Sequence, residues 1–261
     1  MKTTEPTPVP LATSAIKTLL FTIGAKGGTG KTITALGLAD WLAVNRRPFT
    51  PLDCDHENQG KISAFANAFP EGSVGRPDLR SEDACDRLLL TASEAETGLT
   101  LADLPANSGA DFLEWYKAVC TPENLAELNL RVIVIGVITP ESATFGAIAD
   151  WAKVMQGTVS YIIALNHRHP ARGERSLAEL MPDYFASETG RRFRAAFNPV
   201  ELEIPAMQGK AMADMLASNR LPSLAAECRD IQALNRTRIR GWVNQIHAGL
   251  AAADQTLHLL N

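Results

Sequence analysis

Short apolar segments alternate with longer segments of helical periodicity along most of the chain. Apolar runs bounded by turn residues are typical of strands, and their alternation with helices predicts a parallel sheet with crossover connections. The run 131–138 is β-branched almost throughout, as expected for a central strand buried on both faces. The predicted strands cover residues 19–23, 48–52, 99–102, 131–138, 160–165 and, more weakly, 200–204.

Helical segments occupy most of the remaining chain. They are predicted at residues 31–45, 81–93, 108–119, 141–156, 173–181, 207–218, 222–235 and 238–258. We find no internal repeat and no boundary of a second domain. The expected fold is therefore one α/β domain over residues 18–261, doubly wound, with a mostly parallel sheet and helices on both faces. Residues 1–17 are expected to form a flexible arm, since their Thr- and Pro-rich start lacks the apolar region of a secretory signal.

Composition narrows the function classes. The hydrophobic fraction of 46% and the charged fraction of 21% are ordinary for a globular protein, and the net charge of −4 does not favour nucleic-acid binding by the molecule as a whole. The segment 166–240 is nevertheless basic, with 12 Lys and Arg against 9 Asp and Glu, which suggests one positive face. The 4 cysteines form no Cys-x-x-Cys pair, which argues against a zinc site, an iron–sulfur centre or a disulfide framework.

A glycine-rich segment carries the strongest chemical signal. Residues 25–32, Ala-Lys-Gly-Gly-Thr-Gly-Lys-Thr, lie between a predicted strand and a predicted helix. In that setting backbone N–H groups and the helix N-terminus converge on phosphate oxygens, Lys31 reaches the β- and γ-phosphates, and Thr32 ligates Mg²⁺. The alternative is a glycine-rich turn without a ligand. The predicted nucleotide-binding residues here are Gly27, Gly28, Thr29, Gly30, Lys31, Thr32 and Ile33.

Carboxylates follow two of the predicted strands. Ligands of doubly wound sheets lie beyond the carboxyl ends of the strands, so these positions are candidates for Mg²⁺ and for catalysis. Asp103 ends an apolar strand and is expected to hold Mg²⁺, through a water molecule. Asp53 and Asp55 follow the second strand, where the alternative is an Asx turn at a strand end.

The segment 26–32, Lys-Gly-Gly-Thr-Gly-Lys-Thr, resembles the deviant Walker A motif of the ParA/MinD family of ATPases. The resemblance implies that Lys26 crosses a dimer interface and touches the partner's nucleotide, in a homodimer that sandwiches ATP. It also implies that Asp55, in a segment similar to switch I, lies near Mg²⁺ and orients the attacking water. Lys26, Lys31 and Asp55 are thus the expected catalytic residues, although His56-Glu57 departs from the Pro-Gln usual in the family.

The same resemblance suggests an adenine pocket. Relatives place an asparagine after the fifth strand, where its amide pairs with the adenine edge, and Asn166 matches that position. Ile204 and Pro205 match a segment that packs near the base. The alternatives are a turn residue for Asn166 and a strand terminus for the other pair. The segment 106–110 resembles a switch II loop that rearranges around the γ-phosphate.

ParA-type relatives also imply partners. They are cytoplasmic ATPases, nucleoid-associated when bound to DNA, whose hydrolysis is slow and stimulated by a partner such as a centromere-binding or relaxosome protein. Their ATP-bound dimers bind DNA without sequence preference, which implies a role in plasmid partition, stability or conjugation. Arg236 and Arg240, on one helix face, and Arg191 and Arg192 are the candidate phosphate contacts, with a solvated charged face as the alternative.

Two other functions stay open at this point. A metabolic kinase or ligase of the same fold would act on a small substrate, although Lys26 counts against it. A MinD-like ATPase localised to a membrane or a partner would need a basic amphipathic C-terminal helix. The last stretch carries no Lys or Arg beyond Arg240, so membrane binding is not expected.

Overall fold

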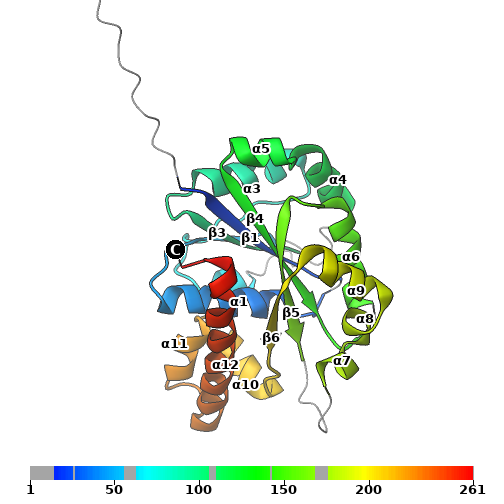
Figure 1. Cartoon of the computed structure of the whole chain (residues 1–261). Helices are drawn as coiled ribbons and strands as arrows, with labels where there is room; N and C mark the ends of the chain where they lie inside the picture. The colour runs from blue at the N-terminus through cyan, green and yellow to red at the C-terminus, as the bar shows by residue number, and fades with distance from the viewer. Residues whose placement is uncertain are drawn as a thin grey trace, which may run out of the picture.

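Six parallel strands form one sheet in the computed structural model, which describes residues 15–25, 27–55, 63–105, 110–141, 143–167 and 176–260. The order across the sheet is β2-β3-β1-β4-β5-β6 (Figure 1). The strands are β1 Lys17–Ile23, β2 Thr50–Asp53, β3 Leu99–Asp103, β4 Leu130–Ile138, β5 Val159–Asn166 and β6 Val200–Ile204. All six predicted strands are confirmed, with ends that move by one or two residues.

The centre of the sheet is β1 between β3 and β4. The register pairs Phe21 with Ala102 on one side and with Val134 on the other. β4 is buried at all but one of its positions, because helices cover both of its faces. The chain passes from β1 to the edge strand β2, returns to β3 beside β1, and then crosses to β4 on the other side of β1. The loop after β1 therefore lies where the strand order switches. Loops at such a point are open to a ligand.

Helices cover both faces of the sheet (Figure 1). Two apolar clusters form the core, one beneath α1, α10, α11 and α12, and the other beneath α3, α4, α6, α8 and α9. The helices are α1 Lys31–Val44, α2 Ala64–Asn67, α3 Glu82–Glu94, α4 Ala110–Val119, α5 Pro122–Glu127, α6 Thr144–Val154, α7 Leu177–Leu180, α8 Pro182–Phe185, α9 Glu188–Phe197, α10 Gly209–Ala217, α11 Pro222–Glu227 and α12 Ala233–Leu257.

Some helix predictions were wrong. The sequence pattern did not predict α2, α5, α8 or α9, and it placed the last helix break near residues 236–237, whereas α11 ends at Glu227 and α12 begins at Ala233. α9 buries only Gly190 and Phe193, so its apolar stripe is too narrow to recognise. Its start is instead set by Ser187, whose hydroxyl accepts the Gly190 N–H.

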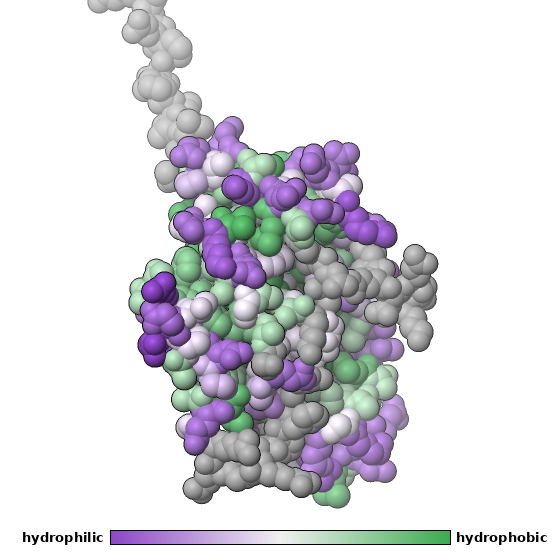
Figure 2. Space-filling model, turned by 90° about the vertical axis from the view of Figure 1, so that its right-hand side faces the viewer, coloured by the Kyte–Doolittle hydropathy of each residue, from purple (hydrophilic) through white to green (hydrophobic). Residues whose placement is uncertain are grey.

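One side of the molecule presents α9 and its neighbours to solvent. In Figure 2 hydrophilic residues spread over much of this face, with smaller hydrophobic areas between them. Within the described ranges no helix has the length and apolar character needed to cross a bilayer. Of the predicted arm, residues 1–14 lie outside the described part of the chain, and β1 already begins at Lys17.

Candidate functional site

The loop between β1 and α1 requires glycine at defined positions. Gly30 has a φ of 100°, in the left-handed region, and a Cβ there would lie 2.2 Å from Nδ2 of Asn166. Gly28 has a φ of 78°. A Cβ on Gly24 would lie 2.8 Å from the Thr29 hydroxyl, whereas one on Gly27 would meet nothing within 4 Å. The loop is thus tightly packed on the protein side and open at Gly27, as an anion-binding loop requires.

The N-terminus of α1 has no side-chain cap. Gly30 occupies the N-cap position, and the first turn contains no acidic residue, although the helix has 14 residues. The first backbone N–H groups of a helix carry partial positive charge and normally need an acceptor. This helix end therefore suits a phosphate group. Lys31, its first residue, is 7% exposed, and its charge acts on the nearby Asp103 carboxylate.

Asp103 joins the ends of β1, β3 and α1. Its carboxylate accepts one hydrogen bond from the Thr32 hydroxyl at 2.7 Å and one from the Thr22 hydroxyl at 2.8 Å. The side chain is 1% exposed. Burial raises its pKa to about 6, and the two threonines and the charge of Lys31 oppose that rise. The carboxyl is therefore mostly ionised at neutral pH, and a bound cation would favour the ionised form further.

This pair of oxygen groups fits Mg²⁺. The Thr32 hydroxyl and the Asp103 carboxylate are in direct contact at the end of the phosphate-binding loop. Mg²⁺ prefers hard oxygen ligands, retains several waters and takes one or two protein groups together with substrate phosphates. The sequence predicts Thr32, Asp103 and Asp55 as the metal residues. The first two are in contact here, and Mg²⁺ binding stays a prediction.

Asp53 lies directly opposite Asp103 in the pairing of β2 with β3. It is fully buried, and its carboxylate accepts the Ser63 hydroxyl at 2.8 Å and the Asp55 backbone N–H at 3.2 Å. Arg76 approaches it at 3.5 Å. Burial raises the pKa of Asp53, while Ser63, Asp55 and Arg76 oppose the rise. The Asx-type contact named as the alternative is present, and it fixes where the backbone of Asp55 lies.

The candidate adenine residues lie at the ends of β5 and β6. Asn166 is buried, and its amide donates to the Thr29 carbonyl at 2.7 Å, so it braces the phosphate-binding loop. Ile204 is fully buried in the core, and the carbonyl of the half-buried Pro205 accepts from the Trp242 indole at 2.9 Å. Contact of these residues with adenine stays a prediction.

The candidate DNA contacts already have partners within the chain. Arg236 donates to the carbonyl of Ile231 at 3.0 Å and more distantly to two carbonyls just before it, and Arg240 pairs with Glu227 at 2.8 Å. Arg191 and Arg192 both pair with Glu188. The structure thus places the arginines on two separate helices, α12 and α9. Lys26, His56, Glu57 and the segment 106–109 lie outside the described residues.

Three partners of the site were not predicted. Thr22 bonds Asp103 and accepts the Leu104 N–H, while Ser63 and Arg76 hold Asp53. A signal for Thr22 exists, because it is a polar residue in the apolar run that leads into the glycine loop. Ser63 and Arg76 gave no signal, since their positions relative to Asp53 depend on how the chain folds back along β2.

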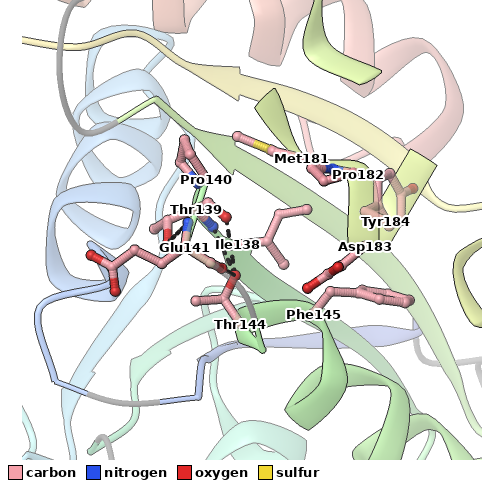
Figure 3. Close-up of a pocket in the computed structure, with 10 residues that line it drawn as sticks. All are labelled: Ile138, Thr139, Pro140, Glu141, Thr144, Phe145, Met181, Pro182, Asp183 and Tyr184. Carbon is pink, nitrogen blue, oxygen red and sulfur yellow. Dashed lines mark hydrogen bonds between the residues drawn. The ribbon is translucent and has the colours of Figure 1, made fainter. Parts of the chain in front are cut away.

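A small cavity lies beyond β4 (Figure 3). Its volume is about 50 Å³, which accommodates one or two water molecules and no nucleotide. The Thr144 hydroxyl accepts the Thr139 N–H at 3.1 Å, and Asp183 accepts the Ala143 N–H at 3.1 Å. Glu141 points away from the cavity in the same view. These hydrogen bonds stabilise the carboxyl end of β4, and the cavity is a small packing space beside it.

The three buried cysteines, Cys54, Cys85 and Cys120, offer no reactive group. All 4 are free thiols, and three of them are buried. Burial raises the pKa of Cys85 to about 11 and that of Cys120 to about 12, and it also raises the pKa of Cys54. Thiols of this kind stay protonated and unreactive. The described residues contain no group of three or more His, Cys, Asp or Glu side chains arranged to hold a metal.

A parallel doubly wound sheet, a glycine loop leading into an uncapped helix and a buried threonine–carboxylate pair define a nucleotide-binding protein of the P-loop class. Residues 20–250 match the family described as the CobQ/CobB/MinD/ParA nucleotide binding domain. The chain therefore belongs to this family of ParA/MinD-type nucleotide-binding proteins. No curated protein matches the sequence.

One of three similar solved structures supports the fold. The MinD cell division protein of Aquifex aeolicus superimposes with a TM-score of 0.51 at 12% identity, over 90% of this chain and 96% of that one. A MinC:MinD cell division protein complex from the same organism gives 0.49 at 13% identity, over 85% and 94%. A nucleotide-binding protein in complex with ADP from Archaeoglobus fulgidus gives 0.42 at 16% identity, over 79% and 88%.

Proposed function

We propose that the protein is an ATP-dependent dimerising switch that hydrolyses ATP and positions or segregates DNA. The observation that carries the nucleotide part is the contact between the Thr32 hydroxyl and the Asp103 carboxylate beside the uncapped N-terminus of α1. A purely structural role does not readily explain why a buried carboxylate, a buried lysine and a helix N-terminus without a side-chain cap lie at one place. A triphosphate with its metal satisfies all three.

Different residues of the chain have separate roles in phosphoryl transfer. The loop N–H groups and Lys31 bind the β- and γ-phosphates, and Thr32 and Asp103 would hold Mg²⁺, which neutralises phosphate charge when bound. Asp53 fixes the backbone at Asp55, whose carboxylate orients a water for in-line attack on the γ-phosphorus. The new P–O bond forms as the bond to the bridging oxygen of ADP breaks, and orthophosphate leaves.

Replacement of the loop lysine tests nucleotide binding. Lys31→Ala is expected to weaken Mg²⁺–ATP binding by at least about a hundredfold, since it removes a buried cation that faces the phosphates. Isothermal titration calorimetry measures the change. Lys153→Ala is the matched control, because Lys153 is 71% exposed on α6 and pairs with the exposed Asp150.

The same preparation separates an ATPase switch from a metabolic kinase or ligase of this fold. Orthophosphate release from ATP without any added metabolite supports the switch. Turnover that appears only when a small acceptor substrate is supplied would contradict it. Equal ATP affinity of Lys31→Ala and the unmodified protein would overturn the site itself.

The DNA part is supported by family resemblance and by exposed cations on α9. Arg191 and Arg192 are 59% and 79% exposed, so both can reach a phosphate backbone after releasing Glu188. The double change Arg191→Ala with Arg192→Ala is expected to weaken retention of nonspecific DNA and to lower its salt dependence by about two counterions. Gel-shift titration over a salt series, with ATP and Mg²⁺ present, measures both. If the dependence of DNA affinity on salt concentration is unchanged, α9 does not contact DNA.

A further inference from the structure

Among the described residues β6 is an edge strand of the sheet, paired with β5 on one side and with no strand on the other. The His167 N–H donates to the Ile204 carbonyl, so the backbone of Ile204 faces β5. Because successive residues of a strand direct their N–H and C=O groups to opposite edges, the backbone groups of Glu201 and Glu203 face outward. Within the described part of the chain no hydrogen bond outside the sheet reaches them. β6 thus presents an open row of donors and acceptors.

A groove runs along this edge, between β6 and α12. It has a volume of about 700 Å³, and its helix side is formed by small residues, among them Ala248, Gly249 and Ala252. The helix comes close to the strand there, because a Cβ on Gly249 would lie 2.9 Å from a methyl carbon of Leu202. Small residues leave room for another backbone beside the strand. Figure 1 shows α12 and β6 side by side.

The groove continues past the end of the strand. A second hollow of about 180 Å³ follows residues 205–208 and has Arg238, Gly241 and Gln245 of α12 on its other side. Pro205 and Gln245 line both hollows, so the two are adjacent. Together they follow the chain from Asn198 to Gln208, a path that an extended peptide can occupy and a compact ligand cannot fill.

The negative charge along the exposed edge of β6 determines which kind of peptide segment can bind there. Glu201 and Glu203 are two residues apart on β6, so their side chains share one face of the sheet, and both are exposed. Glu201 accepts the Tyr184 hydroxyl, and Glu203 lies 3.3 Å from His167. Within the described ranges neither carboxylate pairs with a lysine or an arginine. A second copy of β6 would bring glutamates against glutamates, which is unfavourable, whereas a basic strand is complementary.

We propose that the groove between β6 and α12 binds an extended segment of a partner protein by strand addition, with Lys or Arg at alternate positions opposite Glu201 and Glu203. Main-chain hydrogen bonds to the open edge provide affinity, and the alternating charges set the register. The intervening side chains face α12 and must be small or apolar to fit beside Ala248 and Ala252. The surface is built from β6 and α12 and needs no residue of the phosphate-binding loop.

Amide hydrogen exchange measured by NMR tests the proposal directly. The probe is an end-blocked peptide, Lys-Val-Lys-Val-Lys, added to the full chain. The amides of Glu201 and Glu203 are expected to exchange at least about tenfold more slowly with peptide, because they gain acceptors. The amides of Leu202 and Ile204 pair with β5 and serve as internal controls that stay slow. Absence of binding, or binding without protection at Glu201 and Glu203, would overturn the proposal.

Charge reversal provides the second arm. Glu201→Lys with Glu203→Lys is expected to weaken binding of the lysine peptide at least about tenfold and to favour Glu-Val-Glu-Val-Glu instead. The control is Glu123→Lys with Glu127→Lys, an exposed pair on α5 that adds the same charge far from the groove. Fluorescence anisotropy of labelled peptides measures affinity.

A steric variant separates charge from shape. Ala252→Phe places an aromatic ring in the groove at an exposed helix position, and it is expected to weaken the lysine peptide to a similar degree. Retained Mg²⁺–ATP affinity shows that each variant is folded and separates this result from any failure of the nucleotide site. Equal loss in the α5 control, or none in the Ala252→Phe variant, would exclude strand addition here.

Discussion

At the scale of single residues, Asp103 carries the clearest physical consequence. Its ordinary pKa is 3.8, and burial raises the folded-state value to about 6. Between these values the folded protein binds a proton that the unfolded chain has lost. Its contribution to the free energy of unfolding therefore falls as pH rises from about 4 to 6 and is constant above that range. Binding of Mg²⁺ requires the ionised form, so metal binding and proton release are coupled.

We therefore expect Mg²⁺-dependent nucleotide affinity to fall about tenfold for each pH unit below about 6, the pKa to which burial raises the Asp103 carboxyl. Calorimetric titrations from pH 5 to about 8, with and without Mg²⁺, measure the effect. The terminal phosphate titrates in a similar range, so the comparison with Asp103→Asn isolates the carboxyl group. If the Mg²⁺-dependent part of the profile is the same in Asp103→Asn, this carboxyl does not hold the metal.

At the scale of elements, the junction between α11 and α12 explains why a helix prediction failed. The apolar pattern continues through residues 228–232, but the chain turns there and the Arg236 guanidinium reaches back to the Ile231 and Cys228 carbonyls. A cation that satisfies the carbonyls of a preceding turn is common at helix junctions. Arg236 thus holds α11 against α12, a role that periodicity cannot reveal.

Loss of this contact is expected to be measurable. Arg236→Ala should lower the free energy of unfolding by about 1–2 kcal/mol, since it removes charge-assisted hydrogen bonds from partly buried carbonyls. Urea denaturation measures the change, and Arg229→Ala, at an exposed position of the same junction, is the control expected to stay within about 0.5 kcal/mol. An Arg236→Ala variant with unchanged stability and weakened DNA retention would instead support the DNA-contact hypothesis for this residue.

At the scale of the whole molecule, the open question is how two copies share the nucleotide. The phosphate-binding loop lies at the carboxyl edge of the sheet, and the family resemblance predicts that Lys26 reaches from one copy into the site of the other. This contact can form only when two copies assemble. The ATP-bound dimer must therefore be measured directly.

The expected assembly separates Lys26 from Lys31. With Asp55→Ala to slow hydrolysis, light scattering in ATP and Mg²⁺ should show a dimer, and the added change Lys26→Ala should return it to a monomer. Lys26→Ala should bind ATP within about threefold of the unmodified affinity, because its proposed contact is with the partner's nucleotide. A monomer in the Asp55→Ala background would contradict the dimeric switch, and equal loss of binding and dimerisation would contradict the cross-subunit role.

The sequence by itself determined the layers and the position of the loop. The β-branched run 131–138 favours a strand buried on both faces, and a glycine loop between strand and helix is typical of phosphate binding. These features can be read locally, because strand preference and the backbone conformation of glycine depend on residue type and on adjacent residues. The contacts that organise the site are not local. Asp103 meets Thr32 across 71 residues of sequence and Asn166 meets Thr29 across 137.

Only the tertiary structure decided which of these distant residues are in contact. It also decided that the edge of β6 is open and that the Arg236 side chain is held by backbone carbonyls. Strand order fixes which strand ends are neighbours, and no periodicity encodes that order. A side chain's partner depends on the element that packs beside it, so Asn166 proved to brace the loop through its amide. The sequence determines the chemical type of each side chain, whereas the order of the strands determines the distances between side chains.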